Sequence, residues 1–161
     1  MKKLFRLQKD YHDALTADPE FEANEYRPYF ILKNLEYKGK RINVGIPLRS
    51  NINLHFSKNS NEYIATTPTD HTIVKKGNIA GWHITKMVPV SFDKVVGFDI
   101  SKYPSLNAAL IIANDIYKED MINKVKLLLK RLEAGEKVFG TIDFDKFIEK
   151  EEGKWNINHT H

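Results

Sequence analysis

The sequence contains no cysteine, which excludes disulfide bonds, thiol nucleophiles and thiolate-bound zinc. It also has no apolar run long enough for a membrane span or a signal peptide, since basic and apolar side chains alternate between Met1 and Gln8. No repeat and no Pro-, Gly- or Ser-rich linker divides the chain. We therefore expect a soluble, cytoplasmic protein with one folded domain, residues 1–153, and a polar tail, residues 154–161.

The charge balance permits a polyanionic partner without requiring one. Lysine and arginine exceed aspartate and glutamate by 25 to 21, so that the formal net charge is +4. With 161 residues, of which 42% are hydrophobic, the chain is long enough to bury one core.

The hydrophobic pattern changes its period near residue 100. Before that point, short segments rich in β-branched and aromatic residues are expected as strands: residues 3–7, 29–35, 41–46, 63–67, 79–87 and 95–98. Lys38-Gly39 lies between two of them and predicts an antiparallel hairpin. The sequence thus predicts an α+β fold, a twisted, mostly antiparallel sheet with a barrel-like core.

Helices are expected to pack this sheet, among them a long one in the C-terminal half. Apolar residues recur at spacings of three and four from Leu106 to Leu132, and Gly135 follows as a C-cap. Residues 118–120 are charged and allow a break into two helices. A last short helix is expected over residues 145–150, behind Asp143 as its N-cap.

Two polar loops between the expected strands carry the candidate chemistry. The loop at residues 47–55 holds Arg49, Ser50, Asn51 and His55, and the loop at residues 69–78 holds His71, Lys75 and Lys76 ahead of a strand with His83 and Lys86. Metal-free RNA cleavage needs a base for the 2′-hydroxyl proton, an acid for the leaving 5′-oxygen and cations for the phosphorane. Histidine suits both proton roles, and arginine and lysine supply the cations.

Each of these residues also has a structural interpretation that stays open at this point. Arg49 and Ser50 suit a simple turn, His55 suits packing in a continued strand, and His71 suits an ordinary exposed histidine. Lys75 and Lys76 suit a solvated turn, and Trp82 is expected in the core. Asp143 and Asp145 form an Asp-x-Asp pair that nothing nearby completes, so we predict no metal and no cofactor.

The order of segments resembles the type III toxin–antitoxin endoribonucleases, the ToxN/AbiQ/CptN-like family. The resemblance covers most of the chain and rests on these segments: a basic first strand, a polar stretch at residues 9–25, the strand pair at residues 29–46, the turn Pro47-Leu48-Arg49-Ser50, the strand at residues 81–90 with Met87-Val88-Pro89, a long helix, and Gly140-Thr141-Ile142-Asp143-Phe144. It implies a barrel-like sheet and a sequence-selective enzyme that leaves a 2′,3′-cyclic phosphate. The implied partners are target mRNA and a repeated inhibitory pseudoknot RNA in a closed protein–RNA assembly, with neither DNA nor membrane.

Site residues follow from the same resemblance. The catalytic serine of the family falls on Ser50, while Arg49 stands where some members have threonine and Ile52 where some have lysine. The cation is then supplied by Arg49, Lys75 or Lys76, and a proton-transfer role is left for His55 or His71. The residues expected to bind RNA are Tyr26, Arg27, Lys33, Asn51, Lys75, Lys76, His83 and Lys86.

Three competing functions remain at the level of sequence. A basic sheet domain that binds RNA without cleaving it is the main alternative. A protein-interaction domain built on the long helix and a metal-dependent nuclease are the others. A steep loss of RNA affinity with rising salt would distinguish the RNA-binding functions from a protein-interaction domain. Cleavage activity in the presence of a chelator would exclude a metal-dependent nuclease.

Overall fold

The structure, a computed structural model, describes residues 4–53, 64–66, 78–99, 101, 115 and 117–148, with the backbone alone at residues 50, 51, 53, 64–66 and 78–80. Within these residues, no helix combines the length and the apolarity needed to cross a membrane. In this part of the chain seven strands form one sheet, and all of their pairings are antiparallel. The strands are β1 (Phe5–Leu7), β2 (Tyr29–Tyr37), β3 (Lys40–Asn53), β4 (Ile64–Thr66), β5 (Asn78–His83), β6 (Val88–Val90) and β7 (Val95–Gly97).

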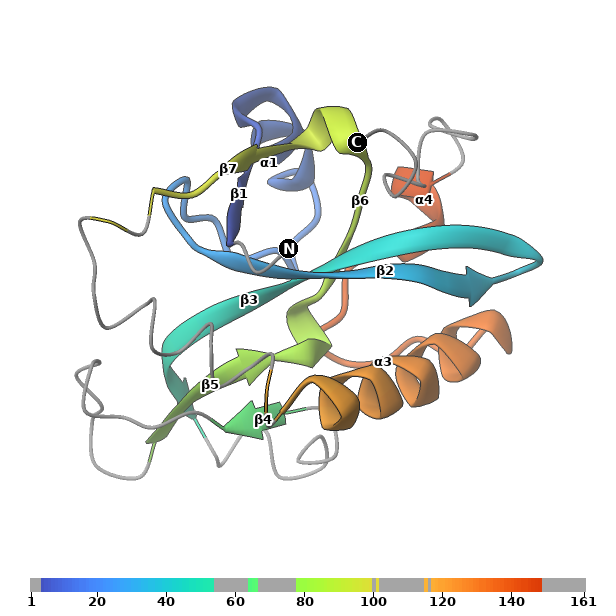
Figure 1. Ribbon diagram of the computed structural model, residues 1–161. Helices are drawn as coiled ribbons and strands as arrows, with labels where there is room; N and C mark the ends of the chain where they lie inside the picture. The colour runs from blue at the N-terminus through green and yellow to red at the C-terminus, as the bar shows by residue number, and fades with distance from the viewer. Residues whose placement is uncertain are drawn as a thin grey trace.

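The sheet has the order β4-β5-β3-β2-β1-β7, with β6 paired to β3 on the edge opposite β2 (Figure 1). The α+β class and the mostly antiparallel sheet are confirmed. The barrel-like core is not, because among the described residues the sheet stays open, with β4 at one end of its path and β7 at the other.

The long β2–β3 hairpin organises the sheet (Figure 1). Lys38 and Gly39 have φ values of 50° and 76°, the pair of positive values that a type I′ turn requires, so the predicted hairpin is confirmed. A bulge interrupts β2 between Leu32 and Leu35. Its Asn34 N–H donates to the Asn43 side chain (3.0 Å), and the Asn34 carbonyl accepts from Arg41 Nη1 (3.1 Å). Both backbone groups of Asn34 are therefore hydrogen-bonded although the ladder is interrupted there.

Strand β3 is longer than expected. Residues 47–53, predicted as a loop, continue the strand and pair with β5, so the loop prediction was wrong for them. The buried side chains of Leu48 and Ile52 explain the difference, because pairing with β5 places them in apolar surroundings. β3 thus pairs with β2 and β6 through its first half and with β5 through its second half.

The segment expected as one strand at residues 79–87 divides at His83. A 3-10 turn, η2 (Ile84–Lys86), follows β5 and is closed by the Met87 N–H on the Ile84 carbonyl (2.9 Å). Strand β6 lies beyond the strand expected at residues 79–87, within the segment 81–90 that the family resemblance gives as a strand. Here Pro89 lies opposite Val44 on a strand that pairs with β3 alone among the described strands, as proline at a sheet edge does. A second 3-10 turn, η3 (Phe92–Lys94), leads into β7.

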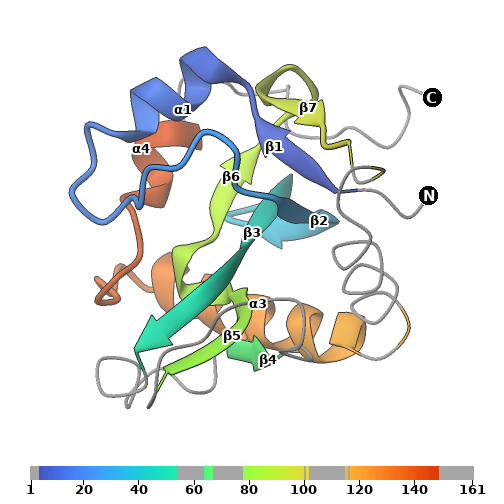
Figure 2. The same ribbon diagram turned by 90° about the vertical axis from the view of Figure 1, so that its left-hand side faces the viewer.

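Helices α1 (Lys9–Leu15) and α4 (Phe144–Ile148) lie together on one side of the hairpin, and α3 (Lys118–Glu133) lies on the other (Figures 1 and 2). The Tyr11 ring of α1 meets the Phe147 ring of α4 edge-on at 6.5 Å between centroids. The charged residues 118–120, where the sequence allowed a break between two helices, form the first turn of α3. The end of α3 follows the prediction: Gly135, with φ of 83°, accompanies the paired bonds Gly135 N to Leu132 O and Glu136 N to Arg131 O of a Schellman motif.

Candidate functional site

Arg49 lies near the middle of the sheet, where β3 passes from β2 to β5. It pairs with Gly81 of β5, and the next pair along the ladder is Ile52 with Ile79. Between these pairs β3 has one residue more than β5, which makes a β-bulge at Ser50 and Asn51. Bulges change the direction of side chains and are frequent next to active sites. The backbone of the predicted catalytic serine therefore lies in an irregular position directly after Arg49.

His83 contacts the Arg49 guanidinium from the buried side. The Nδ1 of His83 lies 2.7 Å from the Nη1 of Arg49. A guanidinium can only donate, so the His83 Nδ1 accepts and the ring is the neutral tautomer with its proton on Nε2. Burial, together with the charges of Arg49, Lys86 and Arg27, lowers the pKa of His83 from its ordinary 6.5 to about 3. Hydrogen-bond geometry and electrostatics thus agree that His83 is neutral near pH 7.

Glu22 contacts the same guanidinium from the solvent side. Its Oε2 lies 2.5 Å from the Nη2 of Arg49. The Arg49 side chain is 16% exposed and the Glu22 side chain 42% exposed, so the carboxylate covers the cation but itself remains in contact with water. Burial lowers the pKa of Arg49, an effect that Glu22 opposes, and the guanidinium stays charged because its ordinary pKa is so high.

Arg27 and Tyr29 line the neighbouring strand. Arg27 Nη1 donates to the Leu48 carbonyl (3.3 Å), one residue before Arg49, and its Nε is buried without a hydrogen-bond partner in the described structure. The Tyr29 ring is buried, and burial raises the pKa of its hydroxyl. Tyr26, in contrast, is 73% exposed next to Arg27. This arrangement leaves an exposed aromatic ring beside a second, partly buried guanidinium.

Lys86 provides a third cation and is also covered. Its Nζ donates to the Glu20 carbonyl (2.8 Å) and lies 3.6 Å from the Glu20 carboxylate. Residues 18–22, the acidic segment, thus reach both Lys86 and Arg49. Asp18 anchors this segment by accepting the N–H of Glu20 (2.9 Å) and, through its other oxygen, the N–H of Asp143 (2.7 Å).

The acidic segment was missed by the reasoning from sequence. Its signal was present, since residues 18–22 hold three carboxylates shortly before the strand pair. Acidic residues in a connection are usually solvated, so this composition by itself points to no site. Phe21 adds the physical anchor: it packs on the core, and its ring meets the His12 ring edge-on at 5.4 Å.

The remaining predicted residues divide into two groups. Lys33 is exposed at the bulge of β2, beside Leu32, which pairs with Val44. At about 3.3 Å per residue, the path along β3 from Val44 to Arg49 is roughly 16 Å, so Lys33 is not part of the Arg49 cluster. His55, His71, Lys75 and Lys76 lie outside the described residues, as do the side chains of Ser50 and Asn51.

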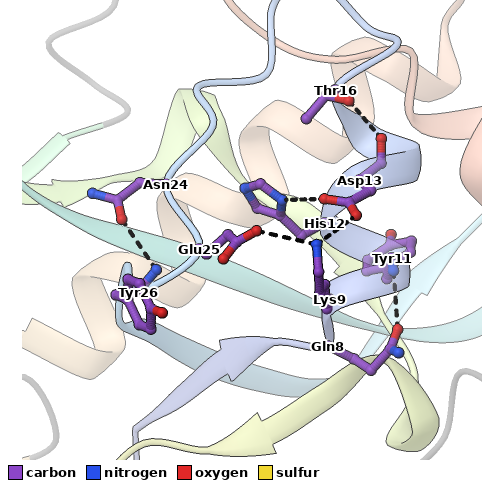
Figure 3. A network of polar contacts seen from close by, with 9 residues as sticks. All are labelled: Gln8, Lys9, Tyr11, His12, Asp13, Thr16, Asn24, Glu25 and Tyr26. Atoms are coloured by element: carbon purple, nitrogen blue, oxygen red, sulfur yellow. Dashed lines mark hydrogen bonds and ion pairs between the residues drawn. The ribbon is translucent and has the colours of Figure 1, made fainter.

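A possible metal-binding group occurs elsewhere, on α1 and the segment after it. The ligand atoms of His12, Asp13 and Glu25 lie within 4.8 Å of one another (Figure 3). Lys9 Nζ contacts both carboxylates, Asp13 at 3.1 Å and Glu25 at 3.4 Å. Because this ammonium already contacts both carboxylates and would repel a metal cation placed between them, we assign no metal to the group. The Asp143/Asp145 pair is likewise engaged, since Asp145 accepts from Tyr37 Oη (2.7 Å) and from Lys38 Nζ (2.8 Å).

Comparisons with known proteins agree on the fold. No protein-family model and no curated protein matches the sequence. Among solved structures, the chain is similar to a protein from a bacterial antiviral system that a processed non-coding RNA regulates, with 17% identity, a TM-score of 0.64, and coverage of 94% of this chain and 99% of the other. It is also similar to a protein from a bacterial type III toxin–antitoxin system in which a non-coding RNA pseudoknot selectively inhibits the toxin, with 21% identity, a TM-score of 0.55, and coverage of 92% and 94%. The chain has the fold of these two proteins over nearly its whole length.

Proposed function

We propose that this protein is a metal-independent endoribonuclease, the toxin of a type III toxin–antitoxin system. The observation that carries the proposal is the Arg49 guanidinium, held at one edge by a neutral His83 and placed directly before the β-bulge at Ser50. The fold supports the same class of function, because two proteins with this fold come from systems that a non-coding RNA regulates or inhibits. The order of segments from Tyr29 to Phe144 resembles the same family.

The proposed reaction is transesterification within RNA. A base removes the proton of the 2′-hydroxyl, the 2′-oxygen forms a bond to phosphorus, the bond from phosphorus to the 5′-oxygen breaks, and an acid protonates the leaving oxygen. The product is a 2′,3′-cyclic phosphate and a 5′-hydroxyl. Negative charge builds up on the phosphorane oxygens, and a preorganised donor at that place lowers the barrier.

In this scheme Arg49 stabilises the phosphorane, because its planar guanidinium donates to two phosphate oxygens at once. Ser50 is the proposed catalytic serine. His55 and His71 are the proposed proton-transfer groups, since the neutral, buried His83 is unsuited to protonate a leaving group near pH 7. Lys75 and Lys76 are proposed as further cations.

RNA is the proposed partner, both as substrate and as a folded, repeated inhibitor in a closed protein–RNA assembly. Arg27 and Lys86 flank Arg49 and are proposed to contact phosphates, and the exposed ring of Tyr26 is proposed to stack on a base. Lys33 and Asn51 are proposed as additional RNA contacts, with Lys33 at a separate place on the hairpin. His83 contributes through Arg49.

Cleavage of end-labelled RNA in excess chelator tests the activity. The wild type is expected to cut, and Arg49→Ala and Ser50→Ala are each expected to lower the rate by at least roughly 100-fold, the effect of losing one transition-state donor. Arg41→Ala is the matched control, because Arg41 is exposed and donates to the Asn34 carbonyl on the hairpin, away from the site. Equal loss in the Arg41 and Arg49 variants, or abolition of cutting by the chelator, would contradict the proposal.

A non-catalytic RNA-binding domain is the second candidate. It is favoured by the state of His83, which is neutral and has its Nδ1 occupied by Arg49, so that His83 is not available for proton transfer in the described part of the site. The same assay decides between the two. RNA that stays bound in a salt-dependent manner but remains intact would support the binding domain.

A further inference from the structure

The contact between Glu22 and Arg49 resembles a complex between the enzyme and an anion. Arg49 has two sides in this structure: Nη1 faces the buried His83 at 2.7 Å, and Nη2 faces the Glu22 carboxylate at 2.5 Å. A carboxylate and a phosphodiester both carry one negative charge and accept hydrogen bonds from a guanidinium. Glu22 therefore occupies the direction from which a phosphate would approach Arg49.

The two contacts differ in how easily they break. His83 is 7% exposed, and the Arg49 side chain is nearly buried, so separating them would leave two polar groups without water. Glu22 is 42% exposed at the carboxylate end of the contact, and exposed ion pairs contribute little net stability. A competing anion thus replaces Glu22 more easily than it disturbs the pairing of Arg49 with His83.

The acidic segment is built to keep this carboxylate nearby. Asp18 accepts the N–H groups of Glu20 and Asp143, and Phe21 packs on the core, so the backbone that leads to Glu22 is anchored. The Glu20 carbonyl and carboxylate cover Lys86 in the same way. Both cations are masked by one segment whose side chains reach solvent.

We propose that Glu22 is a built-in stand-in for an RNA phosphate, and that RNA must displace its carboxylate from Arg49 in order to bind. The identification of RNA as the ligand rests on the proposed function, whereas the anion site at Arg49 rests on the geometry. Competition from Glu22 weakens the binding of every anion at Arg49 by the same factor, so ligands that contact Arg49 alone bind weakly. RNA overcomes this competition because it makes further contacts, at Arg27 and Tyr26 among others.

The experiment measures binding of a 2′-O-methyl RNA, which the proposed reaction cannot cleave, by fluorescence anisotropy. Glu22→Gln removes the charge and keeps the shape, and we expect about fivefold tighter binding, the upper end of what an exposed ion pair contributes. Glu25→Gln is the matched control. It makes the same change in net charge on the same connection, but Glu25 contacts Lys9 instead of Arg49. Its affinity is expected to change less than about twofold.

A double-mutant cycle assigns the gain to Arg49. In an Arg49→Ala background, Glu22→Gln is expected to raise the affinity for RNA no more than Glu25→Gln does, because the masked cation is absent. Thermal unfolding of each variant verifies that the fold persists. The inference is overturned if Glu22→Gln leaves affinity unchanged or weakens it, or if the gain persists without Arg49.

A titration with inorganic phosphate, followed by NMR of the Arg49 guanidinium protons, separates this inference from the proposed function. Tighter phosphate binding by Glu22→Gln, with no RNA bound by any variant, would support the masked anion site and refute the RNA function. Equal phosphate binding by Glu22→Gln and the wild type would refute the masked site, even if the wild type cleaves RNA.

Discussion

His83 accepts a hydrogen bond from Arg49, with 2.7 Å between Nδ1 and Nη1, although 34 positions separate the two residues in the chain. This relationship assigns His83 a positioning role: it orients the guanidinium and is itself uncharged.

Replacing His83 tests the positioning role. His83→Gln keeps an acceptor for Arg49 and is expected to retain most cleavage activity, whereas His83→Leu is expected to lose about 10- to 100-fold, as for a hydrogen bond to a charged group. The pH–rate profile of His83→Gln should keep the shape of the wild-type profile, because the pKa of His83 is about 3. Disappearance of a limb between pH 5 and 8 in this variant would instead make His83 a proton-transfer group.

Acid sensitivity is the second consequence of a buried neutral histidine. The pKa of His83 is lowered by burial from its ordinary 6.5 to about 3 in the folded protein. Between these pH values the unfolded state binds more protons, so the free energy of unfolding falls as pH falls from 6.5 toward 3. Urea unfolding of the wild type and His83→Gln at pH 7, 5 and 4 measures this, and the variant should lose less stability.

Protonation of carboxylates at low pH lowers the free energy of unfolding of both the wild type and His83→Gln, so this contribution cancels when the two proteins are compared. The pKa of Asp13, for example, is lowered by its hydrogen bond with His12 and by Lys9, and both groups are unchanged in the variant. If the wild type and His83→Gln lost equal stability between pH 7 and pH 4, the pKa of His83 would not be lowered in the folded protein.

Gly140 and Gly135 offer a matched pair for backbone strain and crowding. Both have positive φ, 88° and 83°. A Cβ at Gly140 would lie 3.2 Å from the Thr85 Cγ2, while one at Gly135 would meet nothing within 4 Å. We expect Gly135→Ala to lower the free energy of unfolding by about 1 kcal/mol through strain and Gly140→Ala by about 2 kcal/mol through strain and overpacking. Chemical denaturation of both variants measures the difference, and equal losses would contradict the crowding.

The hydroxyl of Tyr37 joins the end of the hairpin to α4. It donates to the Asp145 carboxylate at 2.7 Å, while the Tyr37 ring is buried. Tyr37→Phe is expected to lower the free energy of unfolding by about 1 kcal/mol, the net value of one such bond. Tyr26→Phe, at an exposed ring, is expected to have no measurable effect on unfolding. A Tyr37→Phe variant as stable as the wild type would show that Lys38 satisfies Asp145 alone.

Local patterns predicted much of the fold because they report on neighbours in the chain. The type I′ turn at Lys38-Gly39 and the Schellman motif at Gly135 follow from residues a few positions apart. The extent of β6 could not be predicted from its own residues, since a proline is tolerated in a strand only where its edge stays unpaired, and that depends on how β6 pairs with β3.

The candidate site was predictable only in part. Arg49, Ser50, His83 and Lys86 were singled out by residue type, and the structure brings Arg49, His83 and Lys86 to one cluster around a β-bulge. Nothing local indicated that Glu22 would reach Arg49, because that contact depends on how the segment between α1 and β2 packs against β3 and η2.

The sequence by itself determined several elements of the described structure: the β2–β3 hairpin of an antiparallel sheet, the end of helix α3 before Gly135, and the presence of several cations and imidazoles. The tertiary structure alone decided which of these groups meet and in which charge state. Residue type sets the ordinary pKa of a histidine, but burial and three neighbouring cations hold His83 neutral. Likewise, the charge of Arg49 was evident from the chain, but its masking by Glu22 was not, because desolvation and contacts between distant segments exist only after folding.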